Sequence, residues 1–210
     1  IIMLVEEGKV KINDNVSVYL PSFKEQMVAV RNGDGVDNFD LVPAEREITV
    51  RDLLTHTSGV MSGQISSGAG NPLFVTRHDT GLAWVDDLGA APLEFQPGSR
   101  WSYSAVAGFD MLSRIVEIAS GQNFNDFLKE RVFGPLMMQD IFFWPNNDQR
   151  QRLVTSYNLN DGQLIPRNNP DSMSGEVFFS GAGGLMASAE AYAQFGMLLA
   201  QGGELNGTRL

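Results

Sequence analysis

The feature that most constrains the fold is an apolar repeat at helical spacing in the middle of the chain. Its members recur every three or four positions: Val106, Phe109, Leu112, Ile115, Val116 and Ala119. This spacing places them along one face of an α-helix, and such a face has to pack against a core. Gly121 follows as the residue that ends the helix. The chain must therefore form a core that receives one long amphipathic helix.

Two more helices are expected on either side of this repeat. Residues 48–54 predict a short helix with Thr49 as its N-cap and Asp52 at the third helical position, as in a capping box. Asn123 caps another helix, which stops at Gly134 and the proline after it. The residues expected on the inner side of that helix are Phe124, Phe127, Leu128 and Val132.

The last third of the chain predicts a glycine turn followed by a helix. Glycines between positions 181 and 184 form the turn, but the lysine of a phosphate-binding loop is missing. Ser188 caps the helix, which ends at residues 202–203. The residues expected to point inward are Tyr192, Phe195, Leu198 and Leu199.

At each end of the sequence we expect a secondary-structure element of which only a part is present. Gly8 suits the left-handed position just after a helix, so residues 1–7 are expected to be the last turns of one. Asn206 and Gly207 predict a hairpin turn whose second strand begins at Thr208. We therefore expect residues 1–210 to be an internal segment of one domain, truncated at both ends. Frayed termini are the alternative.

The remaining stretches predict loops. In residues 31–40 the aspartates recur at every third position, whereas the ligands of an EF-hand calcium loop stand at alternate positions. These residues are therefore expected to be a solvated loop. Residues 61–81 and 145–180 are expected to be long, loop-rich regions, of the kind that often carries function. Few strands and no domain boundary are apparent.

The composition is that of a globular protein and excludes several classes of function. Of the 210 residues, 43% are apolar and 19% charged, and the formal net charge is −10. No basic run exceeds two residues, so no nucleic-acid partner is expected. The lack of cysteine excludes disulfides, thiolate zinc sites and a cysteine nucleophile. No apolar run approaches the roughly 20 residues of a transmembrane helix and no signal peptide is visible, which leaves the compartment and oligomeric state open.

Motifs for nucleophilic and metal catalysis are missing from the chain. No serine lies in a G-x-S-x-G elbow, and none of the four lysines follows a serine by three positions. His56 and His78 do not form an H-E-x-x-H pair. For His56 a hydrogen-bonded structural role is favoured over a catalytic one, and for His78 beside Asp79 an exposed loop is favoured over a catalytic pair.

The stretch PGSRWSYSAVAGFDML, residues 97–112, leaves two interpretations open. Tyr103 and Ser104 stand just before the long helix, where they could cap it and pack against it. Tyr103 could equally belong to a catalytic site whose other residues lie elsewhere.

Four stretches together resemble one family of serine hydrolases, which includes class C β-lactamases, family VIII carboxylesterases and D-alanyl-D-alanine peptidases. They are LVEEGKVKINDNVSVYLPSF (4–23), ITVRDLLTHTSG (48–59), FQPGSRWSYSAVAGFDMLSRIVEIASGQ (95–122) and GAGGLMASAEAYAQFGMLLAQGGELNGTRL (181–210). The resemblance covers most of the chain. It implies an α+β fold of the β-lactamase/transpeptidase type, in which a mainly helical region flanks an antiparallel sheet. Most of that sheet would lie outside these residues.

The family uses three sequence boxes, and only the middle one is present. Tyr103-Ser104-Ala105 matches the tyrosine box Y-S-x and has the expected Pro97, Gly98 and Trp101 before it. The resemblance implies that the S-x-x-K serine precedes Ile1 by on the order of ten residues, in the same helix. The third box is expected beyond Leu210.

The resemblance implies a catalytic role for Tyr103. A free phenol is a poor base at neutral pH, but a neighbouring lysine ammonium favours its anion, which can then take the proton of the serine. The serine would attack a carbonyl and form an acyl-enzyme, and backbone N–H groups would stabilise the oxyanion. Tyr103, or a water that it orients, would then assist deacylation. No metal or organic cofactor is implied.

The resemblance further implies a small-molecule ester or β-lactam-like substrate. β-Lactamases usually have Asn at the third box position, so Ala105 favours an esterase. Ser62 stands where many relatives have a pocket aromatic and is expected, with Ala105, in the pocket wall. An acyltransferase, a D-amino-acid peptidase and a non-catalytic penicillin-binding-like recognition module remain as alternatives. Without its serine, the 210-residue segment alone is expected to be inactive.

Overall fold

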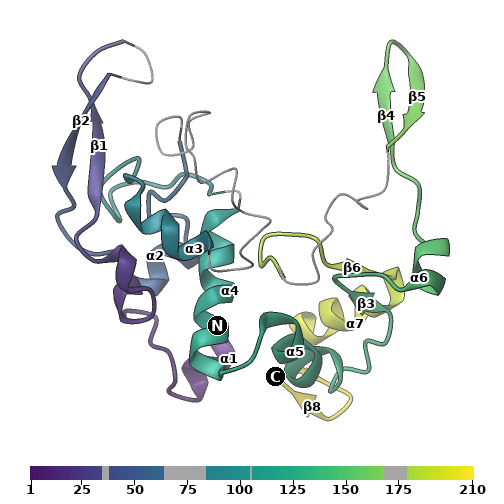
Figure 1. Ribbon diagram of the computed structural model, residues 1–210. Helices are drawn as coiled ribbons and strands as arrows, with labels where there is room; N and C mark the ends of the chain where they lie inside the picture. The colour runs from purple at the N-terminus through teal and green to yellow at the C-terminus, as the bar shows by residue number, and fades with distance from the viewer. Residues whose placement is uncertain (35–37, 64–83, 105, 168–178) are drawn as a thin grey trace.

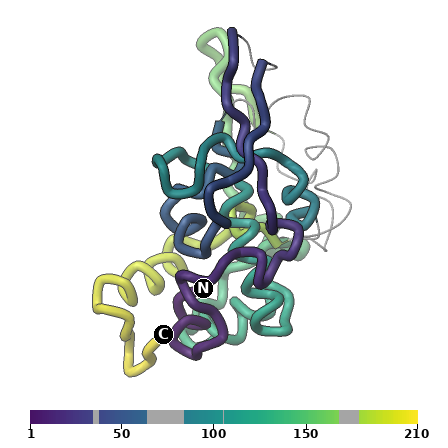
Figure 2. Tube along the Cα trace, turned by 90° about the vertical axis from the view of Figure 1, so that its left-hand side faces the viewer, coloured from purple at the N-terminus to yellow at the C-terminus, as the bar shows by residue number. Residues whose placement is uncertain are grey.

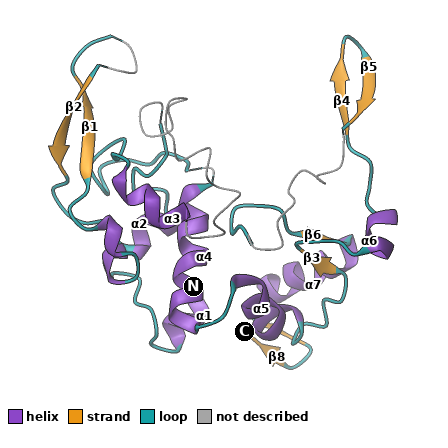
Figure 3. Ribbon diagram, viewed as in Figure 1, coloured by secondary structure: helices purple, strands orange, loops and turns teal. Residues whose placement is uncertain are grey.

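The computed structural model describes residues 1–34, 38–63, 84–104, 106–167 and 179–210 as helices and short antiparallel strands (Figures 1 and 3). The α-helices are α1 (Ile2–Glu6), α2 (Val50–Leu54), α3 (Trp84–Asp87), α4 (Ala107–Ser120), α5 (Phe124–Leu128), α6 (Asn147–Gln151) and α7 (Ala189–Ala200). Short 3-10 turns are η1 (Val16–Val18), η2 (Pro21–Phe23) and η5 (Leu88–Ala90), and η6 (Lys129–Phe133) is a π-helical turn.

The strands form four antiparallel pairs. They are β1 (Met27–Arg31) with β2 (Phe39–Pro43), β3 (Ile141–Phe142) with β6 (Met186–Ala187), β4 (Tyr157–Asn160) with β5 (Gln163–Pro166), and β7 (Glu204–Leu205) with β8 (Thr208–Arg209). The pairs β1–β2 and β4–β5 extend from the helices at the same end of the molecule (Figures 1 and 2).

Helix α4 is the centre of the larger core, as its apolar repeat predicts. Met111, Ile115 and Val116 are fully or almost fully buried, and α4 contacts α1, α2, α3 and α5. Gly121 ends the helix with φ of 74°, a left-handed conformation that glycine adopts without the steric cost of a Cβ atom. The expected long amphipathic helix is therefore confirmed.

Most of the buried apolar side chains fall into two clusters. The first surrounds α4 and includes Leu4, Phe23, Leu53 and Trp84. The second is smaller and consists of Phe133, Leu136, Met138, Ile141, Ala191, Leu198 and Leu205. An ion pair between Glu7 and Arg131 links α1 to η6, close to the point where the chain passes from the first cluster to the second.

The capping residues form the bonds that the sequence predicts. The Asp52 N–H donates to Thr49 Oγ1 over 3.3 Å, and the Thr49 N–H donates to the Asp52 carboxylate over 2.9 Å, which completes the capping box of α2. Asn123 accepts from the Asp126 N–H at the start of α5, and Ser188 accepts from the Ala191 N–H at the start of α7. These three helix starts are confirmed.

The turn signals at the two ends are confirmed. Gly8 follows α1 with φ of 72°. Asn206 and Gly207 have φ of 51° and 78°, and strands β7 and β8 pair across them. Two central residues with positive φ match the twist of a two-residue hairpin.

The orientation expected for α7 is only partly right. Leu198 is buried in the second cluster, but Tyr192 is 68% exposed and Leu199 is 63% exposed. Apolar residues occupy more than one side of this helix, so the 3.6-residue period does not identify a single inner face. Ala191 and Leu198, seven positions apart, share the buried side.

Two of the expected loops contain hairpins. Arg31 ends β1 and Phe39 begins β2, so the expected loop at 31–40 is the connection of a hairpin in which Arg31 pairs with Phe39. Residues 145–180 contain α6 and the β4–β5 hairpin, whose turn residues Asp161 and Gly162 have φ of 50° and 79°. Asp-Gly is a strong hairpin signal, but the flanking strands are exposed at every position and lack the apolar alternation of a buried strand.

Candidate functional site

Tyr103 lies in a segment without helix or strand shortly before α4. Its side chain is 56% exposed, while that of the next residue, Ser104, is buried. Ser104 Oγ accepts a hydrogen bond from the Gly108 N–H over 3.2 Å and so satisfies a free donor of the first helical turn. The fixed start of α4 thereby sets the position of the phenol, which stays accessible from outside.

The segment that carries Tyr103 is bound to the loop that follows α2. The Gly98 N–H donates to the Thr57 carbonyl over 2.8 Å, and the Ser102 N–H donates to the His56 carbonyl over 3.0 Å. The Ser102 hydroxyl also donates to the Ser62 carbonyl over 2.5 Å. Two stretches of the sequence about 40 residues apart thus run side by side at the candidate site.

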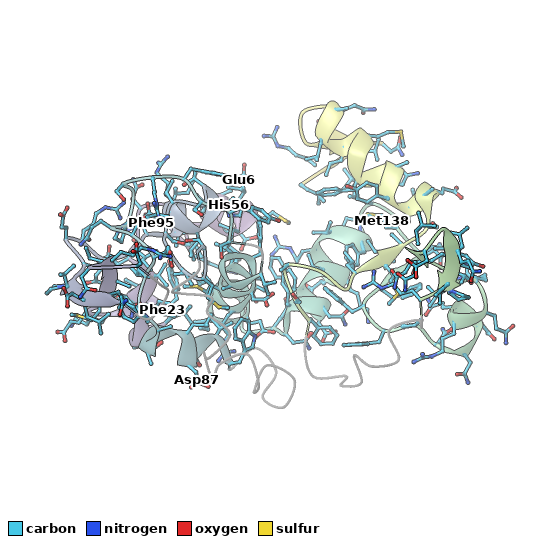
Figure 4. All side chains as sticks on the ribbon, turned by 90° about the horizontal axis from the view of Figure 1, so that it is seen from above. Glu6, Phe23, His56, Asp87, Phe95 and Met138 are labelled. Carbon is cyan, nitrogen blue, oxygen red and sulfur yellow. The ribbon has the colours of Figure 1, made fainter. Side chains whose placement is uncertain are left out.

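His56 lies directly beside Tyr103. Its Nδ1 accepts a hydrogen bond from the Ser104 N–H over 3.3 Å, and the two ring centroids of His56 and Tyr103 are 4.7 Å apart. The edges of Phe109 and Trp101 approach the imidazole with centroid distances of 5.2 Å and 6.2 Å. In Figure 4 the label of His56 lies in the same part of the molecule as those of Phe23 and Phe95. The hydrogen-bonded histidine is confirmed, but its contact with Tyr103 could not be predicted from the sequence.

Asp52 anchors the loop that contains His56. Arg46 binds its carboxylate through two hydrogen bonds of 2.6 Å and 2.9 Å, and the hydroxyls of Thr49 and Thr57 donate to it over 2.7 Å and 3.0 Å. Burial alone would raise the pKa of Asp52, but the hydrogen bonds from Arg46, Thr49 and Thr57 outweigh it and lower the pKa to about 2. The charged carboxylate therefore holds Thr57, and with it the backbone next to His56.

A second buried acid lies on α4. Asp110 is fully buried, and its Oδ1 accepts from the Ser180 hydroxyl over 2.6 Å and from the Ala182 N–H over 3.3 Å. A Cβ atom at Gly181 would lie 2.6 Å from the Phe109 carbonyl oxygen, so only glycine fits this close approach. Asp110 thus joins the glycine turn to α4. In the sequence it is an acidic residue among apolar ones, without a recognisable motif.

The other predicted site residues have different outcomes. Ser62 is half-buried, and its carbonyl accepts a hydrogen bond from Ser102, the residue before Tyr103. Ala105, His78 and most of the loop at 61–81 lie outside the described residues. The assignments of Tyr103, Ser62 and Ala105 to a catalytic pocket stay predictions.

The described ranges contain neither a metal-binding cluster nor a helix that could span a membrane. Within them, no three His, Asp or Glu side chains gather in a way that could hold a metal ion. None of the helices in this part of the chain combines the length and hydropathy that crossing a membrane requires.

Comparison with known proteins identifies the family. The Beta-lactamase family model matches residues 1–210, so the chain belongs to the Beta-lactamase family. Among solved structures, simvastatin synthase (LovD) from Aspergillus terreus is similar with a TM-score of 0.76 and 25% sequence identity, over 94% of this chain and 50% of the synthase. The α+β fold of the β-lactamase/transpeptidase type is therefore confirmed.

Curated relatives include two enzymes. Lovastatin esterase from Penicillium rubens is 29% identical over 96% of this chain, and the D-alanyl-D-alanine-carboxypeptidase/endopeptidase AmpH from Escherichia coli is 33% identical over 74% of it. The matches cover 52% of the esterase and 36% of AmpH. The chain thus spans about half, or less, of the length of these relatives.

Proposed function

We propose that residues 1–210 are an internal segment of a serine hydrolase domain that cleaves carboxylic esters through an acyl-enzyme. Membership of the Beta-lactamase family and the likeness to lovastatin esterase support this proposal. The nucleophilic serine and its lysine would precede Ile1, and the third sequence box would follow Leu210. The serine oxygen bonds to the acyl carbon while the alcohol leaves with a proton, and water then releases the acid.

The observation that carries the proposal is the exposed phenol of Tyr103, held in place at the start of α4. Its segment is fixed by hydrogen bonds to His56 and Ser62, so the phenol has a defined position without being buried. A general base needs this combination of fixed geometry and access to the reacting proton. Tyr103 would take the proton of the serine and later assist deacylation.

The ester preference rests on the residue after Ser104. Ala105 has no polar group, whereas the asparagine of the β-lactamase box offers an amide to the substrate. Ser62, on the segment paired with Tyr103, is the other proposed wall residue. An esterase is therefore favoured over a β-lactamase.

Two other activities and one role without catalysis are the alternatives. Simvastatin synthase and AmpH, named for synthesis and for peptide cleavage, favour an acyltransferase and a D-amino-acid peptidase respectively. Both would share Tyr103 and differ in the group that accepts or presents the acyl carbon. A recognition module would bind acyl or peptide groups without turnover and would lack the S-x-x-K pair upstream.

The test uses the intact gene product that contains these residues. A fluorophosphonate probe should add one covalent adduct, seen in the intact mass, and an activated short-chain ester should be hydrolysed faster than a chromogenic cephalosporin. Replacing Tyr103 by Phe should lower kcat for the ester about 10²- to 10⁴-fold, the usual contribution of a positioned acid or base. Added alcohol should divert little of the acyl-enzyme if hydrolysis is the main reaction.

Tyr157→Phe is the matched control, because this tyrosine on β4 is 53% exposed and thus similar to Tyr103. It should retain full activity. A Tyr103→Phe protein as active as the parent would contradict the assignment of the base. An intact protein without a probe adduct would favour the recognition module.

A further inference from the structure

We infer that His56 is a positioning residue for Tyr103, acting as a neutral hydrogen-bond acceptor that fixes the backbone on both sides of it. The inference rests on the proposed function, since it assigns His56 a part in holding the proposed base. No reacting atom is assigned to His56 itself.

Two hydrogen bonds from the residues that flank Tyr103 end on His56. The Ser102 N–H donates to the His56 carbonyl over 3.0 Å, and the Ser104 N–H donates to its Nδ1 over 3.3 Å. One residue therefore binds the main chain immediately before and immediately after the phenol. A rotation of the Tyr103 backbone would have to break at least one of these bonds.

The imidazole also limits the rotation of the phenol ring. The His56 and Tyr103 rings are in tilted contact, with centroids 4.7 Å apart and planes at 46°. The Phe109 ring of α4 also contacts His56 in a T-shaped arrangement, with centroids 5.2 Å apart and planes at 74°. His56 thus contacts both helix α4 and Tyr103 and supplies a wall for a side chain that is more than half exposed.

The bond from Ser104 defines the protonation state that the arrangement needs. Nδ1 can accept an N–H only when it carries no proton, so a neutral His56 holds its proton on Nε2. A histidine protonated at both nitrogens would lose the bond to Ser104. This tautomer is assigned from the hydrogen-bond partner of Nδ1.

The backbone of His56 suggests the substitutions that separate its roles. Its φ is 56°, in the left-handed region that Asn and Gly enter more easily than other residues. The Oδ1 of an asparagine lies close to the place of Nδ1 and can accept the Ser104 N–H. Glycine tolerates the backbone conformation but offers no acceptor and no ring.

The experiment compares His56→Asn and His56→Gly in the intact gene product, with thermal unfolding to confirm that both fold. His56→Gly should lower kcat for the activated ester by about 10²-fold with little change in KM, since a base misplaced by on the order of 1 Å costs this much. His56→Asn should recover most of kcat. A merely structural role would lower stability in both variants without this separation of kcat from KM.

Nuclear magnetic resonance of the parent protein provides a readout that does not depend on activity. Residues 1–210 contain two histidines, His56 and His78. The imidazole signal that disappears in His56→Asn is that of His56. The ring nitrogen shifts should report the Nε2–H tautomer at neutral pH. A Nδ1–H tautomer would overturn the inference, because such a ring cannot accept from Ser104.

Tyr103→Phe, measured in the same series, separates the two proposals. Loss of activity in Tyr103→Phe together with unchanged kcat in His56→Gly would overturn the positioning role alone. Full activity in Tyr103→Phe would overturn the catalytic assignment of Tyr103 and, with it, the role inferred for His56. The expected pattern is a large loss in Tyr103→Phe and His56→Gly and rescue in His56→Asn.

Discussion

At the scale of the residue, Asp52 gives the protein a measurable dependence on acid. Its pKa is held at about 2 by Arg46, Thr49 and Thr57, whereas an unfolded chain has an Asp pKa of about 3.9. The stabilisation is therefore complete above about pH 4 and disappears as the pH falls toward 2. Asp52→Asn should lower the free energy of unfolding at pH 7 by on the order of 2 kcal/mol and should remove this part of the acid sensitivity.

Urea unfolding between pH 2 and pH 7 measures the effect. Asp148→Asn is the control, because Asp148 is an exposed acid in the first turn of α6 and its replacement should change stability by less than about 0.5 kcal/mol. Equal pH profiles for Asp52→Asn and the parent protein would show that Asp52 does not carry the acid dependence.

Residue chemistry also limits how much of the candidate site could be predicted. Tyr103 could be found from its box, which is local in sequence. The partner of its segment is His56, and the bond from Ser104 to His56 joins positions 48 apart. No periodicity or cap connects two segments at that distance, so a histidine with an ordinary structural role was the natural prediction. Its hydrogen bond was predicted correctly, and its location beside Tyr103 was not.

At the scale of the element, Gly59 controls how the loop after α2 meets the segment before α4. Its φ is 79°, and a Cβ atom there would lie 2.7 Å from the Phe95 carbonyl oxygen. Gly121, at the end of α4, has a similar φ of 74° and open space around it. Gly121→Ala should therefore cost only the left-handed strain of about 1–2 kcal/mol, and Gly59→Ala should cost at least about 1 kcal/mol more from the clash. Chemical denaturation measures the loss of unfolding free energy in the two variants. Equal losses would mean that the backbone at Phe95 can move away from the added Cβ atom at no cost.

Elements marked by local chemistry, the Asn206-Gly207 hairpin among them, were predictable, and the β1–β2 pair was not. Thr49, Asn123, Ser188 and Gly121 mark helix ends because their side chains or φ angles act within one turn. The β1–β2 pair is defined instead by partners far apart in the chain, such as Val28 and Val42, and β1 also binds a third segment through the Ala29 N–H and the Leu93 carbonyl. The local pattern contains none of these contacts. The prediction of the inner face of α7 was wrong for Tyr192 and Leu199 for the same reason. When a helix is apolar on several sides, its packing partners determine which side is buried.

At the scale of the whole molecule, the two projecting hairpins differ in what they contribute to the core. Val28 of β1 belongs to the first cluster and is almost fully buried. Every residue of β4 and β5 is exposed, and the hairpin is closed at its base by the Arg167 N–H, which donates to the Ser156 carbonyl over 2.8 Å. The similar appearance of the two hairpins in Figures 1 and 2 thus conceals different roles in stability.

Replacing residues 157–166 by two glycines, between Ser156 and Arg167, should leave the free energy of unfolding within about 0.5 kcal/mol of the parent value, because no core contact is removed. Val28→Ala, a much smaller change, should cost about 2 kcal/mol through lost burial and the cavity left behind. Urea denaturation of the two variants gives the comparison directly. A large loss on removing β4–β5 would contradict this division of stability between the two hairpins, because it would mean that side chains such as Leu159 and Leu164, exposed in this structure, stabilise the fold.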